Sequence, residues 1–324
     1  MSRHTKPLAS TFVALPETAN KQRQLFNALT IDVEEYFQVN GFEGIVPRHV
    51  WDNIPSRVGR STERLVELLA EAGVRATFFV LGWVAQRQPS LVRALHQAGH
   101  EIATHGYAHR LVYSQSPGEF RADLRRSLAI LEDILGQRVD AYRAPSFSIT
   151  ARSQWALDIL IDEGITLDSS IYPIRHDRYG MPQAPVEPHH IGRSGGSLWE
   201  FPPPVVRTCG FNLPVGGGGY FRLLPYAMTR WALQRINAEG RPFAVYLHPW
   251  ELDAEQPRLA CGWKQRFRHY VGLDKTEQRL KQLLRDFRFG TLREALMAWQ
   301  PAAQSSLEKR RDSKDSKAAP ILAA

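Results

Sequence analysis

The chain has 324 residues, of which 43% are hydrophobic and 23% are charged, with 23 glycines and 21 prolines. This composition excludes collagen-like, coiled-coil and wholly disordered chains, and the length suits one large domain or two small ones. The net charge of +8 raises the question of a nucleic-acid partner, but residues 1–23 contribute +3 and residues 301–324 contribute +2. Residues 24–300 are nearly balanced and show no nucleic-acid motif, so we expect no such partner.

Both ends of the chain lack a core pattern. We predict an N-terminal tail at residues 1–24, a single domain at 25–300 and a disordered C-terminal tail at 301–324. The apolar segment 8–15 is short and has no clear cleavage site after it, so it is not a convincing signal peptide. No apolar run approaches the roughly 18 residues of a membrane span. We therefore expect a cytoplasmic protein with at most peripheral membrane contact, and the oligomeric state stays open.

Between the tails, short apolar runs alternate with amphipathic segments. The apolar runs predict strands at residues 29–33, 76–81, 101–104, 139–142, 165–167, 198–201 and 243–247. The amphipathic segments predict helices at residues 65–72, 89–98, 117–135, 150–163, 225–239 and 276–287. Ser61 and Thr62 are candidate caps of the first helix, and Ser116-Pro-Gly-Glu119 predicts a capping box for the third.

The alternation of strands and helices implies parallel strands covered by helices, hence an α/β barrel or an open doubly wound sheet. Residues 172–223 break this rhythm and are rich in Pro, Gly and His. We predict a long insertion there, with one short strand, that shapes a site. Within it, the four-glycine run 216–219 predicts either a mobile lid or a tight turn.

Ionisable side chains follow five of the predicted strands at their C-terminal ends. They are Asp32, the pair His105 and His109, Arg143, Asp168 and His248. The C-terminal ends of parallel strands converge on one face of a barrel, which is where such barrels place their active sites. Any one of these residues alone is explained by a structural role, whereas five in register favour a site.

The segment His105-Gly-Tyr-Ala-His109 is the sharpest single motif. Two imidazoles four residues apart lie on one side of a turn, so both can ligate one divalent ion. A carboxylate would complete the ligand set, and Asp32-Val-Glu34-Glu35 supplies three candidates from another strand end. Two histidines and a carboxylate suit Zn²⁺, Co²⁺ or Ni²⁺ almost alike, and we favour Zn²⁺.

Together these motifs resemble those of the polysaccharide deacetylases, the carbohydrate esterase family that shares the chitooligosaccharide deacetylase homology domain. The resemblance spans roughly residues 28–290 and implies a distorted (β/α) barrel. It rests on Thr30-Ile-Asp-Val-Glu34, His105-x-x-x-His109, Arg143-Ala-Pro145, Asp168-Ser-Ser170 with Trp199-Glu-Phe-Pro202, and Leu247-His248.

Three further segments are similar to one subgroup, which is associated with the exopolysaccharide loci of bacteria that carry the exosortase (PEP-CTERM) sorting system. They are Asp32-Val-Glu-Glu-Tyr-Phe-Gln-Val39, Gly216-Gly-Gly-Gly-Tyr-Phe-Arg222 and Leu247-His-Pro-Trp-Glu251.

The resemblance implies a role for each residue at the strand ends. Asp32 would be the general base, oriented by Arg143, and His248 the general acid, while His105 and His109 would bind the metal. The chain departs from the common family pattern of two adjacent acids, because Val33 follows Asp32. An Asp-x-acid variant exists in the wider family, and the third ligand is then Glu34 or Glu35. We prefer Glu34, since alternation places residues 32 and 34 on one face of a strand.

N-deacetylation needs a nucleophile, an oxyanion stabiliser and a proton donor for the leaving amine. A divalent ion lowers the pKa of its water to about 7 and polarises the acetyl carbonyl. We expect a backbone N–H near Ser146, just after Pro145, to complete the oxyanion site. Asp168 is our candidate for the acid that keeps His248 protonated, with a turn cap as the alternative.

Tyr107 and Trp250 are our candidates for sugar contact, and core packing is the alternative for both. The sequence thus predicts a metal-dependent hydrolase that removes N-acetyl groups from amino sugars of a bacterial exopolysaccharide or its precursor. Three rivals stay open. They are a glycoside hydrolase with paired carboxylates such as Asp32 and Glu35, a non-catalytic carbohydrate-binding barrel, and a nucleic-acid or membrane-surface binder that relies on the tails.

Overall fold

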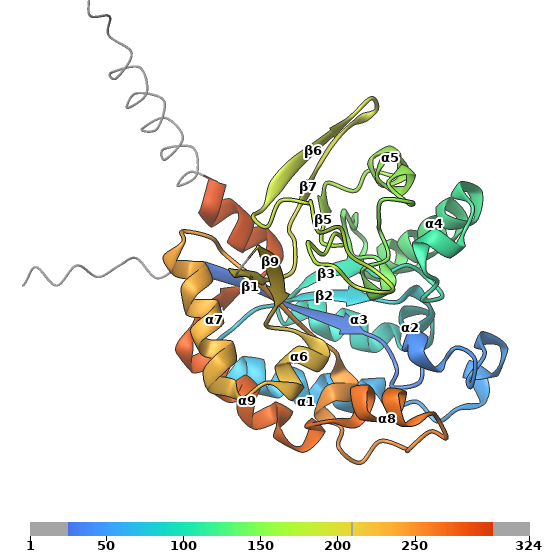
Figure 1. Ribbon diagram of the computed structural model, residues 1–324. Coiled ribbons are helices and arrows are strands. Elements are labelled where there is room, and N and C mark those ends of the chain that lie inside the picture. The colour runs from blue at the N-terminus through green and yellow to red at the C-terminus, as the bar shows by residue number, and fades with distance from the viewer. Residues whose placement is uncertain (1–24, 209, 301–324) are drawn as a thin grey trace, which may run out of the picture.

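A computed structural model describes residues 25–208 and 210–300, which are built around one predominantly parallel sheet (Figure 1). The strands follow the order β10-β1-β2-β3-β4-β5-β7-β6, and β11 also pairs with β1. The antiparallel pair β6–β7 is the exception to parallel pairing in this sheet. Its strands are β1 (Phe26–Val33), β2 (Thr77–Val80), β3 (Glu101–Thr104), β4 (Ala141–Tyr142), β5 (Leu167–Asp168), β6 (His189–Arg193), β7 (Gly196–Glu200), β10 (Ala244–Leu247) and β11 (Arg288–Gly290).

Helices surround the curved sheet in Figure 1. They are α1 (Val58–Glu71), α2 (Gly82–Arg87), α3 (Pro89–Gln97), α4 (Pro117–Leu135), α5 (Trp155–Asp162), α6 (Gly218–Leu223), α7 (Tyr226–Ala238), α8 (Trp263–Tyr270) and α9 (Leu273–Asp286). Short 3-10 turns join them: η1 (Asn40–Phe42), η2 (Arg48–Asn53), η3 (Val112–Ser114), η4 (Pro145–Phe147) and η5 (Pro249–Leu252). The predicted α/β fold is confirmed as a distorted barrel, because among the described residues the end strands β10 and β6 do not pair with each other.

Alternation along the strands separates two apolar cores. On β1, Leu29, Ile31 and Val33 belong to the large core that packs against the helices. Ala28 belongs instead to a smaller core inside the barrel, with the alanines of β3, β4 and β10. These small side chains let the strands approach one another closely at the N-terminal end of the barrel. The next inward-facing positions along the strands are polar. The period of two therefore fills the bottom of the barrel with apolar groups and leaves its top for ionisable ones.

The predicted start of the first helix is wrong. Helix α1 begins at Val58, so Ser61 and Thr62 lie buried inside it and do not cap it. The cap comes from the strand end instead: the carboxylate of Glu35 accepts hydrogen bonds from the backbone N–H groups of Arg57 and Val58, at 3.0 and 3.2 Å. An acid 22 residues away in sequence satisfies the helix terminus, which a search for local caps misses.

The prediction of one short strand in residues 172–223 is also wrong. The segment holds β6 and β7, the separate two-stranded sheet of β8 (Val205–Thr208) and β9 (Phe211–Pro214), and helix α6. The glycine run fits the tight-turn alternative, because Gly216 has φ of +73° and the backbone of Gly217 lies against the ring of Tyr246. A Cβ at Gly217 would lie 2.0 Å from that ring.

The predictions for residues 1–24 and 301–324 lie outside the described residues. Within the described part of the chain, no helix combines the length and hydropathy that crossing a bilayer requires.

Candidate active site

The ionisable groups of the site stand at the C-terminal ends of strands that lie side by side. Asp32 is on β1 and Glu34 directly follows it, while His105, Arg143 and His248 follow β3, β4 and β10. These strands are neighbours in the sheet order or one strand apart. All five side chains are buried or nearly so, and the structure brings them together as the sequence predicts.

Arg143 fixes the position of Asp32. The guanidinium is fully buried and donates to Asp32 Oδ1 and Thr30 Oγ1, each at 2.8 Å. Its other donors reach the carbonyl and hydroxyl oxygens of Ser169, at 3.1 and 2.8 Å. A planar fork held at four points has little freedom to rotate, so the carboxylate it grips is held in one orientation. The other carboxylate oxygen of Asp32, Oδ2, is not engaged by Arg143.

Two imidazoles and one carboxylate form a buried cluster beside Asp32. Ligand atoms of Glu34, His105 and His109 all lie within 4.8 Å of one another. The Nδ1–H of His105 donates to the carbonyl of Arg143 at 2.8 Å, which leaves a lone pair on Nε2. Burial lowers the pKa of His105 to about 4, so this imidazole is neutral at neutral pH. His109 Nε2 lies 2.7 Å from Glu34 Oε2.

The donor set fits a divalent ion. Among the described residues, His109 Nδ1 is buried without a hydrogen-bond partner, and unpartnered polar atoms are costly to bury. Although burial disfavours the charged form, the neighbouring imidazoles hold the pKa of Glu34 far below its usual range, so it is a carboxylate. The neutral imidazole of His105 and the carboxylate of Glu34 are in the protonation states that a metal requires of its ligands.

The structure separates the two adjacent glutamates. Glu34 faces the imidazoles, whereas Glu35 turns away to hold the start of α1 and also accepts a hydrogen bond from the hydroxyl of Ser56. Alternation along the chain accounts for the difference. Glu34 is thus the acid positioned for metal binding.

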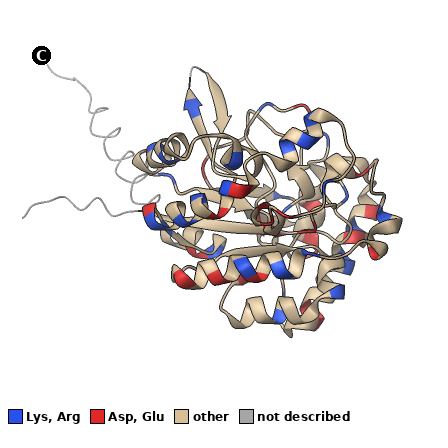
Figure 2. Cartoon of the chain, turned by 90° about the horizontal axis from the view of Figure 1, so that it is seen from below, with Lys and Arg blue, Asp and Glu red and all other residues tan. Residues whose placement is uncertain are grey.

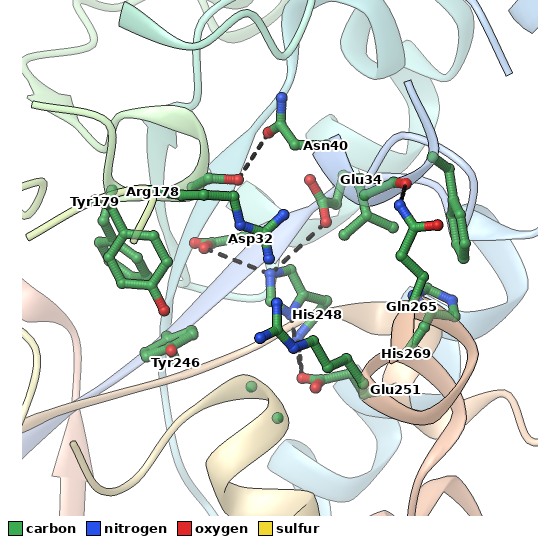
Figure 3. A pocket seen from close by; sticks show the side chains of 18 of the residues that line it. Asp32, Glu34, Asn40, Arg178, Tyr179, Tyr246, His248, Glu251, Gln265 and His269 are labelled. Carbon is green, nitrogen blue, oxygen red and sulfur yellow. Dashed lines mark hydrogen bonds and ion pairs between the residues drawn. The ribbon is translucent and has the colours of Figure 1, made fainter. Parts of the chain in front are cut away.

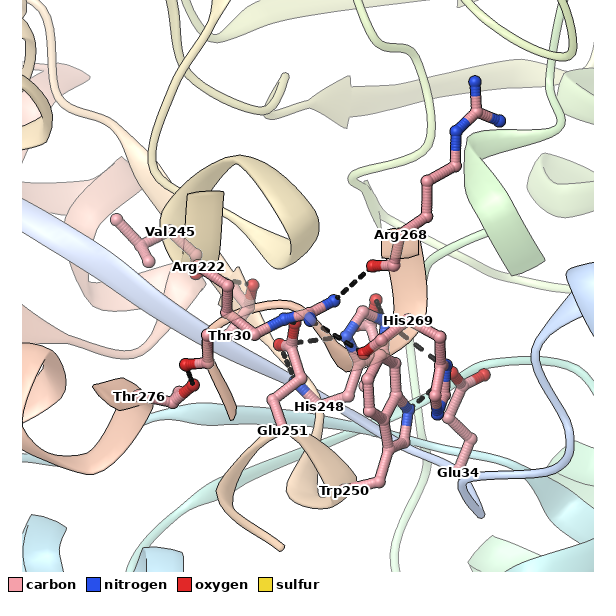
Figure 4. Close-up of polar contacts among 12 residues, drawn as sticks. Thr30, Glu34, Arg222, Val245, His248, Trp250, Glu251, Arg268, His269 and Thr276 are labelled. Carbon is pink, nitrogen blue, oxygen red and sulfur yellow. Dashed lines mark hydrogen bonds and ion pairs between the residues drawn. The ribbon is translucent and has the colours of Figure 1, made fainter. Parts of the chain in front are cut away.

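His248 is held by an acid that the sequence analysis missed. Its Nδ1 lies 3.2 Å from Glu251 Oε2, and its Nε2 lies 3.9 Å from Asp32 Oδ2. Figure 4 shows the chain of contacts that continues from Glu251 to Arg222, whose Nε donates to Glu251 Oε1 at 2.7 Å. Burial opposes protonation of His248, but Glu251 and the acids of β1 outweigh it and raise the pKa of His248 to about 9. The signal available in the sequence was the His248-x-x-Glu251 spacing.

The predicted partnership of Asp168 with His248 is wrong. Asp168 pairs in register with Tyr142, which faces the outer core, so Asp168 points away from the barrel interior. It pairs in register with Glu200 of β7, and burial together with Asp168 raises the pKa of Glu200 well above its ordinary value. The pair therefore shares a proton and joins two strands, while the next residue, Ser169, faces Arg143.

Trp250 does not offer a face to a sugar. Its indole is buried and stacked between the rings of His248 and His269, at centroid distances of 5.0 and 4.2 Å. Its Nε1–H donates to Glu34 Oε1 at 3.1 Å. The predicted substrate contact is therefore replaced by a positioning role, since the indole fixes the carboxylate of Glu34 and both of its faces are covered.

Tyr107 also departs from its predicted role. Its hydroxyl donates to Gln86 at 2.7 Å, and the guanidinium of Arg126 lies 3.6 Å from its ring centroid. These partners belong to α2 and α4, and part of the tyrosine packs against the large core. The core alternative applies to Tyr107.

A cavity of about 480 Å³ opens over the cluster (Figure 3). Its lining includes Asp32, Glu34, the three histidines of the site and Ser146. Among the described residues, the non-glycine residues with positive φ are His109, Ser146 and Phe147, and all three line this cavity. Strained backbone of this kind persists where the surroundings enforce it, typically at functional sites. The Ser146 hydroxyl donates to Asn40 at 2.7 Å, and Pro145 is buried beside it.

Comparison with known proteins agrees with this geometry. A family model described as polysaccharide deacetylase matches residues 49–160, and one described as a domain of unknown function (DUF3473) matches residues 169–297. A peptidoglycan-N-acetylglucosamine deacetylase of Bacillus cereus is 26% identical over 120 residues, which cover 33% of this chain and 44% of that protein. A chitooligosaccharide deacetylase of Sinorhizobium fredii is 44% identical over 48 residues, 15% of this chain and 22% of that protein. The chain thus matches less than half the length of either relative.

A solved structure supports the fold over nearly the whole chain. A Mycobacterium smegmatis protein assigned to the polysaccharide deacetylases is similar with a TM-score of 0.56 at 21% sequence identity. The similarity covers 90% of this chain and 95% of that one.

Proposed function

The chain carries a polysaccharide deacetylase domain, and from this premise we propose that it is a metal-dependent hydrolase that removes N-acetyl groups from amino sugars of a bacterial exopolysaccharide or its precursor. One observation carries the proposal. The Glu34, His105 and His109 cluster lies in one cavity with two oriented proton-transfer groups, Asp32 and His248.

A divalent ion held by Glu34, His105 and His109 would supply Lewis acidity, which polarises an acetyl carbonyl and lowers the pKa of water. Asp32, held by Arg143, accepts the proton of the attacking water through its second oxygen. His248, kept cationic by Glu251, donates a proton to the departing amine nitrogen as the C–N bond breaks. One water is consumed, and acetate and a free amine are released.

The neighbouring turn supports the oxyanion part of the proposal. Ser146 and Phe147 adopt left-handed backbone at the rim of the cavity, which turns the chain of η4 across the site. A backbone N–H in this turn would stabilise the tetrahedral oxyanion. We further propose Zn²⁺ as the ion, with Co²⁺ and Ni²⁺ as alternatives. We also propose that the protein acts at the cytoplasmic side, on the product of an exosortase-associated exopolysaccharide locus.

The geometry supports the rival functions less well than deacetylation. A glycoside hydrolase that paired Asp32 with Glu35 would need both carboxylates at the substrate, but that of Glu35 is engaged by the start of α1. A non-catalytic barrel would not need the paired acid and base groups that the cavity holds. Along the described helices, Lys and Arg are interspersed with Asp and Glu (Figure 2), and the rival that relies on the tails falls on residues outside the described ones.

The test measures bound metal and acetate release on acetylated oligosaccharides for the wild type and for matched variants. We expect E34Q and H105A to lose metal and activity together. D32N should keep the metal and lose activity by about 100-fold or more, because general-base catalysis contributes that much. Acetate release that survives both chelation and D32N would refute the mechanism.

The adjacent glutamate supplies the control. E35Q makes the same chemical change one residue away and should retain metal and acetate release, with about 1 kcal/mol of stability lost from the start of α1. If E35Q loses metal and E34Q does not, the ligand assignment is wrong.

A further inference from the structure

Two arginines line the cavity with no partner for their charge. Arg178 lies in the segment between β5 and β6, and Arg268 lies on α8 at another wall. In the part of the chain that the structure describes, no hydrogen bond or ion pair engages either guanidinium. Figure 4 shows the Arg268 side chain extending away from its own carbonyl, which Arg222 holds at 3.1 Å. Both guanidiniums are therefore free to meet a ligand.

The other charges of the cavity are already balanced by neighbours. Asp32 pairs with Arg143 and Glu251 pairs with Arg222, while Glu34 lies among the histidines that would hold the ion. Because these acids have their own partners, the charge that the cavity presents to an incoming ligand comes from Arg178, Arg268 and the cationic His248. The sign of that charge favours an anion.

The two guanidiniums act on the same small region. His176, Tyr179 and both arginines line the same cavity, and burial together with the two arginines lowers the pKa of His176. The His176 ring stacks on Tyr179 at a centroid distance of 3.8 Å. The acid that precedes Arg178 in the chain, Asp177, is largely exposed and lies 3.0 Å from His176 Nδ1. Figure 3 shows Arg178 and Tyr179 among the groups that line the cavity.

We propose that Arg178 and Arg268 form an anion subsite, which selects N-acetylated saccharides that bear a carboxylate or a phosphate on a sugar next to the one that is deacetylated. Guanidinium groups present a fork of donors that matches both oxyanions. The subsite belongs to the same cavity as the catalytic groups, so the inference rests on the proposed function and names its substrate class.

The experiment compares kcat/KM for acetate release from three substrates at low and moderate salt. They are an N-acetylglucosamine tetrasaccharide, an alternating N-acetylglucosamine–glucuronate tetrasaccharide, and the neutral tetrasaccharide with a phosphate on one sugar. We expect the wild type to prefer at least one acidic substrate by about 10-fold or more, since a charge-assisted hydrogen bond contributes that much. The preferred substrate then identifies the anion. Salt should reduce the preference, because both arginines are exposed.

Matched double variants separate the subsite from general charge effects. R178Q/R268Q should bring the acidic substrate down to the level of the neutral one. R175Q/R266Q removes the same charge from the same two segments, at exposed positions outside the cavity lining, and should keep the preference. Equal rates on all three substrates in the wild type, or an equal loss in both double variants, would overturn the inference.

Calorimetric binding distinguishes failure of the inference from failure of the proposed function. If no substrate releases acetate, the proposed hydrolysis is wrong. The subsite is then supported by tighter binding of an acidic than of the neutral tetrasaccharide, lost in R178Q/R268Q, and is overturned by equal dissociation constants.

Discussion

Replacing Glu251 by Gln tests whether this acid keeps His248 protonated. In the folded protein the pKa of His248 is about 9, against an ordinary value of 6.5. Each pKa unit corresponds to about 1.4 kcal/mol, so the surroundings favour the cation by roughly 3 kcal/mol. Burial acts against the charge, and Glu251 is the largest of the three acids that overcome it. Without Glu251 the pKa of His248 should fall by about 2 units, because burial remains while the main attraction is gone.

The assay is the pH dependence of kcat/KM for acetate release with saturating metal. Protonated His248 is present below its pKa and is lost as the pH rises through it, so this group sets the alkaline limb of the profile. E251Q should move that limb to lower pH by about 2 units. A bound cation lowers the pKa of His248 in both proteins, which makes the difference between them the quantity to measure. An alkaline limb at the same pH in both would refute the reasoning.

Two further variants serve as controls for this test. E255Q removes a negative charge from an exposed position nearby and should leave the limb where it is. E251Q also leaves Arg222 buried without its acid, and breaking a buried ion pair from one side costs about 3–5 kcal/mol. The double variant R222Q/E251Q avoids the unpaired charge, and it should show the same displaced limb if the shift comes from Glu251.

Three other predictions follow from the buried contacts. W250F removes the hydrogen bond to the carboxylate ligand and should weaken metal affinity about 10-fold or more, measured by competition with a chelator; unchanged affinity would deny the positioning role. E200Q should remove a pH-dependent loss of stability: the raised pKa of Glu200 means that the wild type loses stability as the pH rises above about 4.5, by at most about 1.4 kcal/mol per unit. Urea unfolding from pH 5 to 8 checks this, and parallel curves for both proteins would contradict it. G217A places a methyl group against Tyr246 and should lower the free energy of unfolding by about 1–3 kcal/mol, measured by thermal or urea unfolding. G219A is the control, because a Cβ there would make only an ordinary van der Waals contact. Equal losses in both variants would refute the close-approach argument.

Strand alternation and the four-residue spacing of His105 and His109 were enough to predict which of these side chains meet in the cavity. Because side chains alternate across a strand, Asp32 and Glu34 were expected on one face, and the structure places both in the cavity. The same rule, applied to β5, would have turned Asp168 outward and Ser169 inward. Asp168 was assigned to the site because it ends a strand. The face of the strand on which a side chain lies, however, decides which groups it contacts.

Contacts between distant segments were beyond reach of the sequence pattern. Whether Trp250 shows a face to the cavity depends on His269, which comes from α8, and the packing of α8 follows from no local signal. Glu35 likewise gained its role from the start of α1, 22 residues away. The predicted strand at 198–201 overlaps β7, whereas β6 was missed because none of its residues is buried and it lacks an apolar run. Long-range packing therefore decides which polar groups become ligands, caps or supports.

The two family matches divide the chain at a point where the structure does not divide the site. His105, His109 and Arg143 come from the segment matched as polysaccharide deacetylase, residues 49–160, whereas His248 comes from residues 169–297, matched as a domain of unknown function. Strand β10 of the second segment pairs directly with β1, and β7 pairs with β5. The second segment is therefore the other half of one barrel rather than an appended module. It supplies the proposed general acid His248, its partner Glu251 and the two arginines of the proposed anion subsite. The first segment supplies two of the proposed metal ligands and the arginine that orients Asp32, while Asp32 and Glu34 precede both matched segments. The second segment is where this chain would set what it acts on.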